Sequence, residues 1–264
     1  MLRYALLLLL LTFAVACGGS DNAGSTSGEA DVEDDDGMPA GMRQKYSADQ
    51  GTATVKGAIK FEGKARARAT DMGSDKYCTN CYKDGAKPKS ETYIVGANGE
   101  MANVFVYIKD GLSGWKFGKG TSTVNVRQDK CVYVPHVVGM QVGDTLKITN
   151  DDSTMHNIHS SDIERGGDWF NQAQPNKGDV YPTTAERAGF YSMKCDVHGW
   201  MQSYICIVKN PFYSVSGADG GFSLANLPAG TYTIAAWHEK LDEQVQTVTV
   251  KDGETTEISF TFKK

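Results

Sequence analysis

The chain has 264 residues, of which 27 are Lys or Arg and 32 are Asp or Glu, so its formal net charge at pH 7 is −5. Eight of the acidic and two of the basic residues lie between Gly18 and Gln50, and beyond Gln50 the two signs balance at 24 each. This balance does not favour nucleic acid as a partner, because such partners require a basic surface. The part beyond position 51 is long enough for one large or two small domains with hydrophobic cores.

Residues 1–16 predict a signal peptide for export. Arg3 precedes an apolar run at 5–13, which is too short to span a bilayer as a helix. The sequence Ala-Val-Ala-Cys-Gly at 14–18 resembles a bacterial lipobox, although Ala14 stands where Leu is usual. The resemblance implies that Cys17 is the lipidated first residue of an exported protein, anchored at the periplasmic face of a bacterial membrane. The alternative is ordinary cleavage nearby, with Cys17 left as a free thiol.

Residues 17–51 are rich in Gly, Ser, Asp and Glu and contain few large apolar side chains. A segment of this composition cannot bury enough apolar surface to offset the conformational entropy that it loses on ordering. We therefore expect residues 17–51 to be a disordered, acidic tether between the lipid and the folded protein.

Beyond the tether, the chain predicts strands almost throughout. Short runs rich in Val, Ile, Thr, Tyr and Phe alternate with turns rich in Gly, Asn and Asp, and Val104, Val106 and Ile108 fall on one face of such a run. No segment has a sustained apolar period of 3.6 residues. Short strands with frequent turns indicate an all-β protein. The clearest runs are residues 52–61, 103–108, 145–149, 189–195, 203–208, 231–237, 246–250 and 257–262.

Four residues of types that bind copper gather around one short loop. Cys195, His198 and Met201 are separated by two residues each, between a strand that ends at the cysteine and a strand that follows the methionine, and His156 lies 39 residues before Cys195. A thiolate, two imidazoles and a thioether are the ligands of a mononuclear type 1 site, in which one copper ion cycles between Cu(I) and Cu(II). Zinc is the alternative for one Cys and two His, but it has little use for Met201.

This region resembles the cupredoxin, or blue copper, family over residues 120–210. The matching features are the strand Gly-Asp-Thr-Leu-Lys-Ile-Thr-Asn at 143–150, the sequence Met-His-Asn-Ile-His at 155–159, and the short ligand loop, whose spacing is that of amicyanins. The resemblance implies a cupredoxin Greek-key β-sandwich, with a copper domain at residues 119–211.

The resemblance also assigns a supporting role to Asn157. It implies that the backbone N–H of Asn157 donates to the Cys sulfur and that the side chain ties the two ligand loops together. The loop itself departs from the amicyanin pattern. Amicyanin loops carry Pro beside the ligands, whereas this loop has Asp196, Val197, Gly199 and Trp200 between them. The reduction potential therefore does not follow from the resemblance.

These features predict an electron-transfer protein that docks transiently with redox protein partners. We do not expect an enzyme, because four filled copper positions leave no open site for a substrate. We expect His198, at the tip of the loop, to be the electron port, with Gly199 and Trp200 forming a flat docking face. One alternative is a copper-binding carrier or sensor that moves no electrons, and another is a surface scaffold protein with a degenerate site. The oligomeric state does not follow from the sequence.

Four further cysteines, Cys78, Cys81, Cys131 and Cys206, remain, and an even number in an oxidising compartment indicates disulfides. We favour a bond between Cys131 and one member of the Cys78-Thr-Asn-Cys81 motif, which lies in a polar loop at 71–90. Cys206 alternates with Ile on a strand and is expected to be buried. The alternative is a zinc site formed by Cys78, Cys81, Cys131 and His136.

The C-terminal part resembles the carboxypeptidase regulatory-like family, whose members have a transthyretin-like β-sandwich. The matching features are the Gly-rich turn, the Leu-Pro-Ala-Gly turn and the strand after it, all within residues 217–234. The opening half of such a sandwich is found far upstream, at 54–59 and 102–111. We therefore favour a sandwich formed by residues 52–118 plus 212–264, with the copper domain inserted, since insertion is tolerated where the inserted ends lie close. The alternative is a tandem arrangement in which the upstream strands belong to the copper domain.

Overall fold

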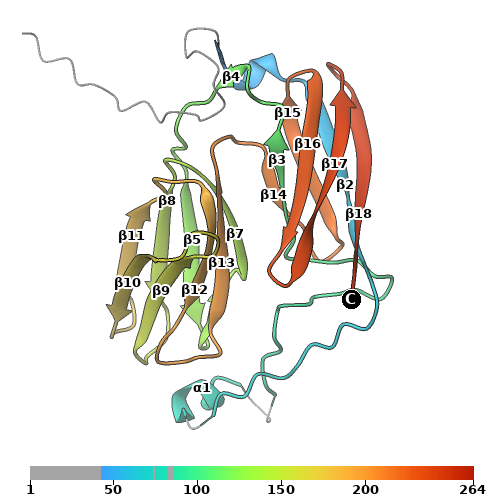
Figure 1. Ribbon diagram of the computed structural model, residues 1–264. Helices are drawn as coiled ribbons and strands as arrows, with labels where there is room; N and C mark the ends of the chain where they lie inside the picture. Colours follow the sequence, from blue (N-terminus) through green and yellow to red (C-terminus); the bar gives the residue numbers. More distant parts are fainter. Residues whose placement is uncertain (1–42, 74, 83–85) are drawn as a thin grey trace, which may run out of the picture. The chain divides into compact units, whose positions relative to one another are not determined.

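The computed structural model describes residues 43–73, 75–82 and 86–264 (Figure 1). The predicted signal peptide, the lipidated Cys17 and the predicted tether up to residue 42 lie outside these residues. Within the described part of the chain, no helix is both long and apolar enough to cross a membrane.

Strands make up most of the described chain, which confirms the predicted all-β class. Alternating burial accounts for them: in β2 the side chains of Ala53, Val55, Ile59 and Phe61 are buried, and more exposed side chains lie between them. The strands are β1 (Gln44–Lys45), β2 (Ala53–Glu62), β3 (Phe105–Asp110), β4 (Trp115–Lys116), β5 (Thr123–Asp129), β6 (Val132–Val134), β7 (Val137–Gln141), β8 (Thr145–Asn150), β9 (His156–Asp162), β10 (Asp168–Gln174), β11 (Val180–Thr184), β12 (Gly189–Lys194), β13 (Gln202–Val208), β14 (Tyr213–Val215), β15 (Gly221–Leu227), β16 (Gly230–His238), β17 (Leu241–Val250) and β18 (Thr255–Lys263), and the helical elements are η2 (Ala48–Gln50) and α1 (Lys76–Asn80).

The first sandwich consists of a five-stranded sheet, in the order β10-β9-β12-β13-β7, and a four-stranded sheet, in the order β11-β8-β5-β6. β13 runs parallel to β7 and β5 runs parallel to β8, while the other neighbours are antiparallel. The apolar side chains between the sheets include Leu146, Ile148, Ile158, Met193 and Ile205. This core makes a rigid base for the loops at the ends of β8 and β12.

The second sandwich consists of a sheet in the order β14-β3-β16-β17 and a sheet in the order β15-β2-β18. Strands from before and after the first sandwich therefore pair directly, since β2 lies between β15 and β18, and β3 lies between β14 and β16. At Gly57 a Cβ atom would lie 1.8 Å from the carbonyl oxygen of Ile258, so the parallel pairing of β2 with β18 requires glycine there.

Residues 43–51 differ from the disordered tether that composition predicts. β1 pairs with β4, and the ring of Tyr46 contacts the rings of Trp115, Phe117 and Phe212 with centroids 5.2–6.0 Å apart. Aromatic contacts of this kind bury enough apolar surface to order a short polar segment. Residues 43–51 thus belong to the folded part of the chain, although their composition predicts a tether.

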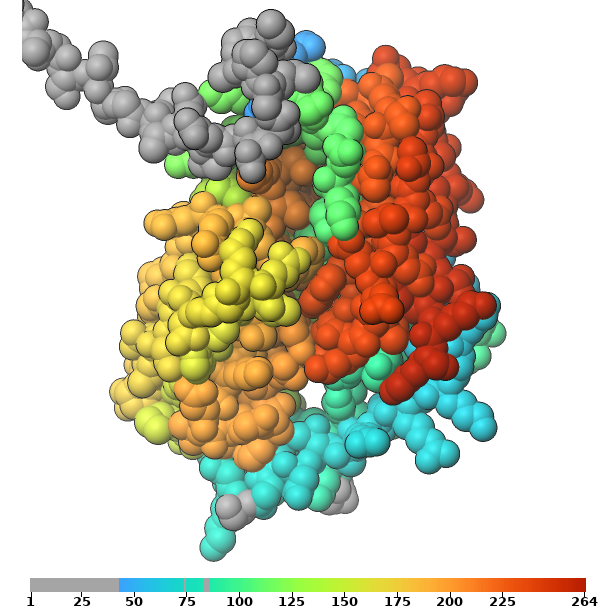
Figure 2. All heavy atoms as spheres, viewed as in Figure 1, coloured from blue at the N-terminus to red at the C-terminus, as the bar shows by residue number. Residues whose placement is uncertain are grey.

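The polar loop predicted at 71–90 also differs from expectation, because it contains α1. Met72 and Cys78 are buried in the core of the first sandwich, although residues 52–118 were expected to belong to the second. Cys78 forms a disulfide with Cys131, which confirms the favoured pairing and excludes a zinc site that needs both thiolates. Figure 2 shows the turquoise atoms of this segment against the orange atoms at one end of the first sandwich.

A further apolar cluster joins strands of both sandwiches, which belong to one compact unit. It includes Phe105 and Ala235 from the second sandwich and Phe190 and Tyr204 from the first. Nearby, the Nε2 atom of His136 lies 2.5 Å from Oε1 of Glu239, and these side chains are 8% and 2% exposed. The contact between the sandwiches therefore combines apolar packing with one buried polar pair.

Candidate metal centre

Two neighbouring strands set the ligand loop. β12 ends at Lys194, β13 begins at Gln202, and these two residues are paired, so residues 195–201 close a tight connection between antiparallel strands. Within it, the Met201 N–H donates to the carbonyl oxygen of His198 at 2.9 Å. The connection is local in sequence, which is why its ligand spacing could be recognised without a structure.

The fourth predicted residue comes from the adjoining strand. β9 begins at His156 and pairs with β12 on the side away from β13. The Nδ1 atoms of His156 and His198 are 2.9 Å apart, and the Cys195 Sγ atom is 3.8 Å from Nδ1 of His198. Three ligand atoms, one from each of these residues (two imidazole nitrogens and the sulfur), lie within 4.8 Å of one another.

All of the predicted ligand residues are removed from solvent. His156 is 0% exposed, Met201 1%, Cys195 2% and His198 3%. Met201 and Cys195 belong to the same apolar cluster of the first sandwich. The structure thus brings His156, Cys195 and His198 to one point, with Met201 buried at the end of the same loop.

The outer nitrogen atoms of the two imidazoles face carboxylates. Nε2 of His156 lies 2.9 Å from Asp152, and Nε2 of His198 lies 3.1 Å from Asp75. An ionised carboxylate only accepts hydrogen bonds, so each Nε2 atom donates its proton and the Nδ1 atom of each ring is directed toward the centre of the site. Because the two Nδ1 atoms are 2.9 Å apart, a proton or a metal ion must lie between them.

A single metal ion fits this donor set. An ion bound to both Nδ1 atoms at about 2.0 Å and to sulfur at about 2.3 Å, which are ordinary lengths for such bonds, is compatible with the separations of 2.9 Å and 3.8 Å. The donors are one thiolate and two imidazoles, with a thioether on the same loop. This combination suits copper better than the hard cations, which prefer oxygen ligands.

The electrostatics favour a thiolate at Cys195. Burial raises the pKa of this thiol, but hydrogen bonds from His156, from the backbone N–H of Asn157 and from His198 outweigh it and lower the pKa to about 7. For His156, burial lowers the pKa, and hydrogen bonds to Asp152 and Cys195 raise it above the usual value. A thiolate is the form of cysteine that binds metal.

Asn157 contacts Cys195 and the residue that follows it. Its backbone N–H points at the Cys195 sulfur, 3.4 Å away, and its Oδ1 atom accepts the backbone N–H of Asp196 at 2.5 Å. Its Nδ2 atom also donates to the Asp196 carboxylate at 3.0 Å. The strand that carries His156 and the loop that carries Cys195 are thereby tied together.

The surroundings of the predicted electron port are more enclosed than a bare loop tip. The side chain of His198 is 3% exposed, and its Nε2 atom lies 3.1 Å from Asp75. Trp200, expected to form a docking face, donates its Nε1–H to the carbonyl oxygen of Cys131 at 3.0 Å. The reason is the segment around α1, which lies over this edge of the site.

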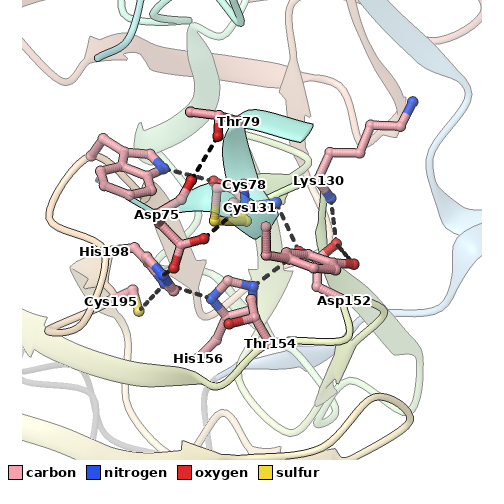
Figure 3. Close-up of a disulfide and its surroundings, with 12 residues drawn as sticks. Asp75, Cys78, Thr79, Lys130, Cys131, Asp152, Thr154, His156, Cys195 and His198 are labelled. Atoms are coloured by element: carbon pink, nitrogen blue, oxygen red, sulfur yellow. Dashed lines mark hydrogen bonds and ion pairs between the residues drawn. A yellow bond between two sulfur atoms is a disulfide. The ribbon is translucent and has the colours of Figure 1, made fainter. Parts of the chain in front are cut away.

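Sequence reasoning missed Asp75, Asp152 and the position of the disulfide beside the site (Figure 3). Asp75 is 123 residues from His198, and no spacing rule links a carboxylate to a metal-binding histidine. Asp152 precedes His156 by four residues in a turn that contains several polar side chains. Proximity to the imidazoles, which only the fold creates, is what distinguishes these two carboxylates.

The remaining histidines and cysteines have other surroundings. His159 lies between Asp168 and Asp196, 2.9 Å and 3.1 Å away, on the outer side of β9. The Nε2–H of His238 donates a hydrogen bond to the carbonyl oxygen of Thr92 at 2.8 Å. Cys206 is fully buried, as its alternation with Ile predicted.

A model of the carboxypeptidase regulatory-like domain family matches residues 208–263, and no curated protein matches the chain. Among solved structures, a purple cupredoxin from Nitrosopumilus maritimus is 27% identical, with 33% of this chain and 100% of that chain covered and a TM-score of 0.30. Amicyanin from Paracoccus versutus is 21% identical, with 34% and 84% covered and a TM-score of 0.30. A copper-containing nitrite reductase from Thermus scotoductus SA-01 is 22% identical, with 34% and 23% covered and a TM-score of 0.29.

Proposed function

We propose that the protein transfers electrons through one copper ion of type 1, held by His156, Cys195, His198 and Met201. The observation that carries the proposal is the convergence of two imidazole Nδ1 atoms, 2.9 Å apart, beside a buried cysteine whose pKa is lowered. This donor set accommodates both Cu(I) and Cu(II). The bound ion would therefore supply a one-electron redox centre.

The residues of the chain would keep the geometry of the site nearly constant when the charge of the ion changes. β9, β12 and β13 hold the ligand residues at strand ends, and the hydrogen bonds of Asn157 fix the two ligand loops relative to each other. The Asn157 N–H donates to the Cys195 sulfur and so withdraws electron density from it. Burial excludes water that would otherwise reorganise at each transfer.

The experiment is to load the purified full-length chain with Cu(II) and to record its absorption and paramagnetic-resonance spectra. We expect the intense visible absorption of a copper–thiolate bond and a reversible redox couple. Cys195→Ser removes the absorption, whereas the matched control Cys206→Ser, at the other buried free thiol, retains it. A loaded wild-type protein without colour would refute the proposal.

The alternative of a copper carrier predicts rapid release of the ion to a chelator. The burial of all four predicted ligand residues, each 3% exposed or less, favours an ion that is retained. A measured release half-time of seconds from wild-type protein, together with the lack of a reversible couple, would support the carrier instead.

We further propose that the protein is a lipoprotein, anchored through Cys17 at the periplasmic face of a bacterial membrane. Its proposed partners are other redox proteins. We also propose that the copper domain spans residues 119–211 within a sandwich of residues 52–118 plus 212–264, of which Met72 and Cys78 pack into the core of the copper domain. The pairing of β2 with β15 and β18, and of β3 with β14 and β16, supports this division. Labelling with a radioactive fatty acid, with Cys17→Ser as the negative control, tests the anchor.

A further inference from the structure

We propose that Asp75 and Asp152 are positioning residues for the two imidazole ligands, and that the Cys78–Cys131 disulfide holds both carboxylates in place. This inference rests on the proposed copper site. It concerns residues 72–73 and 75–82, which we call the cap segment, and the turn at 130–131 to which the disulfide joins it.

Asp152 is held rigidly against His156. Its Oδ2 atom lies 2.9 Å from Nε2 of His156 and accepts the backbone N–H of Cys131 at 2.7 Å, while Oδ1 accepts the backbone N–H of Lys130 at 2.8 Å. Asp152 is 2% exposed. The hydroxyl of Tyr77 also donates to Oδ1 of Asp152, at 3.4 Å. A buried carboxylate with four donors has little freedom to move, so it fixes the orientation of the imidazole ring.

Asp75 performs the equivalent task for His198 from another part of the chain. Its Oδ1 atom accepts the backbone N–H of Cys78 at 2.9 Å, which places Asp75 at the start of α1, and its Oδ2 atom lies 3.1 Å from Nε2 of His198. The two oxygen atoms thus have separate partners. Oδ1 orders the cap segment, and Oδ2 is available to His198.

The disulfide links the two supports. The backbone N–H of Cys78 holds Asp75, and the backbone N–H of Cys131 holds Asp152, so a single covalent bond connects the two residues that position the carboxylates. The same segments touch the ligand loop, because the carbonyl oxygen of Cys131 accepts the Nε1–H of Trp200. Figure 3 shows the disulfide between Cys78 and Cys131 beside Asp75, with the imidazoles of His156 and His198 nearby.

The sulfur atoms themselves lie close to the imidazoles. The Cys78 sulfur forms a group with Asp75 and a His198 nitrogen in which all atoms lie within 4.8 Å, and the Cys131 sulfur forms such a group with Asp152 and a His156 nitrogen. Both sulfur atoms belong to the disulfide and are not thiolate ligands. The disulfide therefore acts as an apolar wall over the outer edges of both rings.

Two consequences follow for the metal. A carboxylate at Nε2 fixes the tautomer and increases the basicity of the ligating Nδ1 atom, which strengthens metal binding. Two nearby negative charges also stabilise Cu(II) relative to Cu(I), because Cu(II) carries the larger positive charge. We therefore expect the carboxylates to increase copper affinity and to lower the reduction potential.

Asp75→Asn tests the proposal with little change of shape. The asparagine Oδ1 atom still accepts the N–H of Cys78, and Asn is a good residue at the start of a helix. Its amide group then opposes the Nε2–H of His198 with a donor in place of an acceptor. We expect the affinity for Cu(II) to fall about 10- to 100-fold, as for other outer partners of metal-binding histidines, and the midpoint potential to rise.

The matched control is Asp219→Asn, because Asp219, like Asp75, accepts a backbone N–H from a residue shortly after it but lies in the second sandwich. We expect its copper affinity and potential to equal those of the wild type. A double variant, Cys78→Ser with Cys131→Ser, provides a second test, because it removes the disulfide and leaves both carboxylates unchanged. We expect its affinity for Cu(II) to fall and its midpoint potential to rise. Circular dichroism melting of each metal-free protein identifies a variant that fails to fold.

The outcomes separate the two proposals. If wild-type protein binds no copper as a type 1 ion, the proposed function fails and this inference fails with it. If the wild type shows the expected spectrum while Asp75→Asn and the folded double variant keep its affinity and potential, only the positioning role is overturned. Lower affinity and a higher potential in both variants, with Asp219→Asn unchanged, support it.

Discussion

The two sandwiches differ in what they bury. Among the described residues, most of the buried polar and charged side chains lie in the first sandwich or its connections, whereas those of the second are Ser216, His238 and Glu239. The second core is a cluster of apolar residues such as Phe222, Tyr232 and Phe260. Because burying polar groups costs free energy unless each is paired, the buried histidines and the carboxylate of Asp152 around Cys195 mark a site, and the apolar second core marks a support.

The largest effect that tests this comparison is loss of core volume in the second sandwich. Phe260 on β18 is 1% exposed, and Phe260→Ala should lower the free energy of unfolding by about 3–5 kcal/mol. The visible spectrum and the copper affinity should not change in the protein that remains folded. Val245→Ala, at a side chain 53% exposed, is the control and should have a much smaller effect. An altered copper spectrum in folded Phe260→Ala would contradict a purely supporting role.

An intermediate effect is expected where the sandwiches meet. Glu239 and His136 form a buried pair, and Glu239→Gln should destabilise the protein at pH 7 by up to about 3 kcal/mol, because it removes one charged partner. Burial raises the pKa of Glu239, but the hydrogen bond and the charge of His136 outweigh it and lower the pKa below 4.5.

The pH dependence of this pair has a definite sign. A carboxyl group whose pKa is lowered on folding stabilises the protein above its unfolded pKa, and it loses that contribution as the pH falls through its folded pKa. The difference between wild type and Glu239→Gln in urea unfolding should therefore be full at pH 7 and shrink below pH 4.5. A difference that persists unchanged at low pH would mean that shape, not charge, is responsible.

The smallest effect is expected at the surface of the second sandwich. Hydrogen bonds from its own backbone N–H and from the side chain and backbone of Asn98 lower the pKa of Glu100 from 4.5 to about 2. Its contribution is thus present above pH 4.5 and is lost as the pH falls toward 2. Glu100→Gln should be slightly less stable than wild type at pH 6, and this gap should close toward pH 2. Glu257→Gln, at an exposed ion pair with Lys56, serves as the control.

Much of the fold and of the candidate site could be predicted because it is encoded locally. The alternation in β2 and β3 indicates strands, and the spacing of Cys195, His198 and Met201 places three donors on one strand connection. The position of Asn157 beside His156 likewise follows from adjacency in the chain. Short-range patterns of this kind reflect strand geometry, which each segment carries by itself.

Local sequence patterns did not predict the structure of segments whose polar composition indicates a loop but whose side chains pack against distant parts of the chain. Residues 43–51 are polar and yet ordered, because Tyr46 meets three aromatic rings that come from elsewhere in the chain. The Cys78-Thr-Asn-Cys81 motif does not show which cysteine bonds Cys131, because α1 decides which sulfur is directed inward.

By itself, the sequence determined the strand-rich class and the chemical types of the ligands that converge on one loop. Only the tertiary structure decided that β2 and β3 pair with strands from the other end of the chain, and that His198 is covered. It alone brought Asp75 and Asp152 to the outer edges of the two imidazoles. The physical reason is that ligand type and strand period are properties of neighbouring residues, whereas burial and hydrogen bonding to a distant carboxylate exist only after the chain has closed on itself.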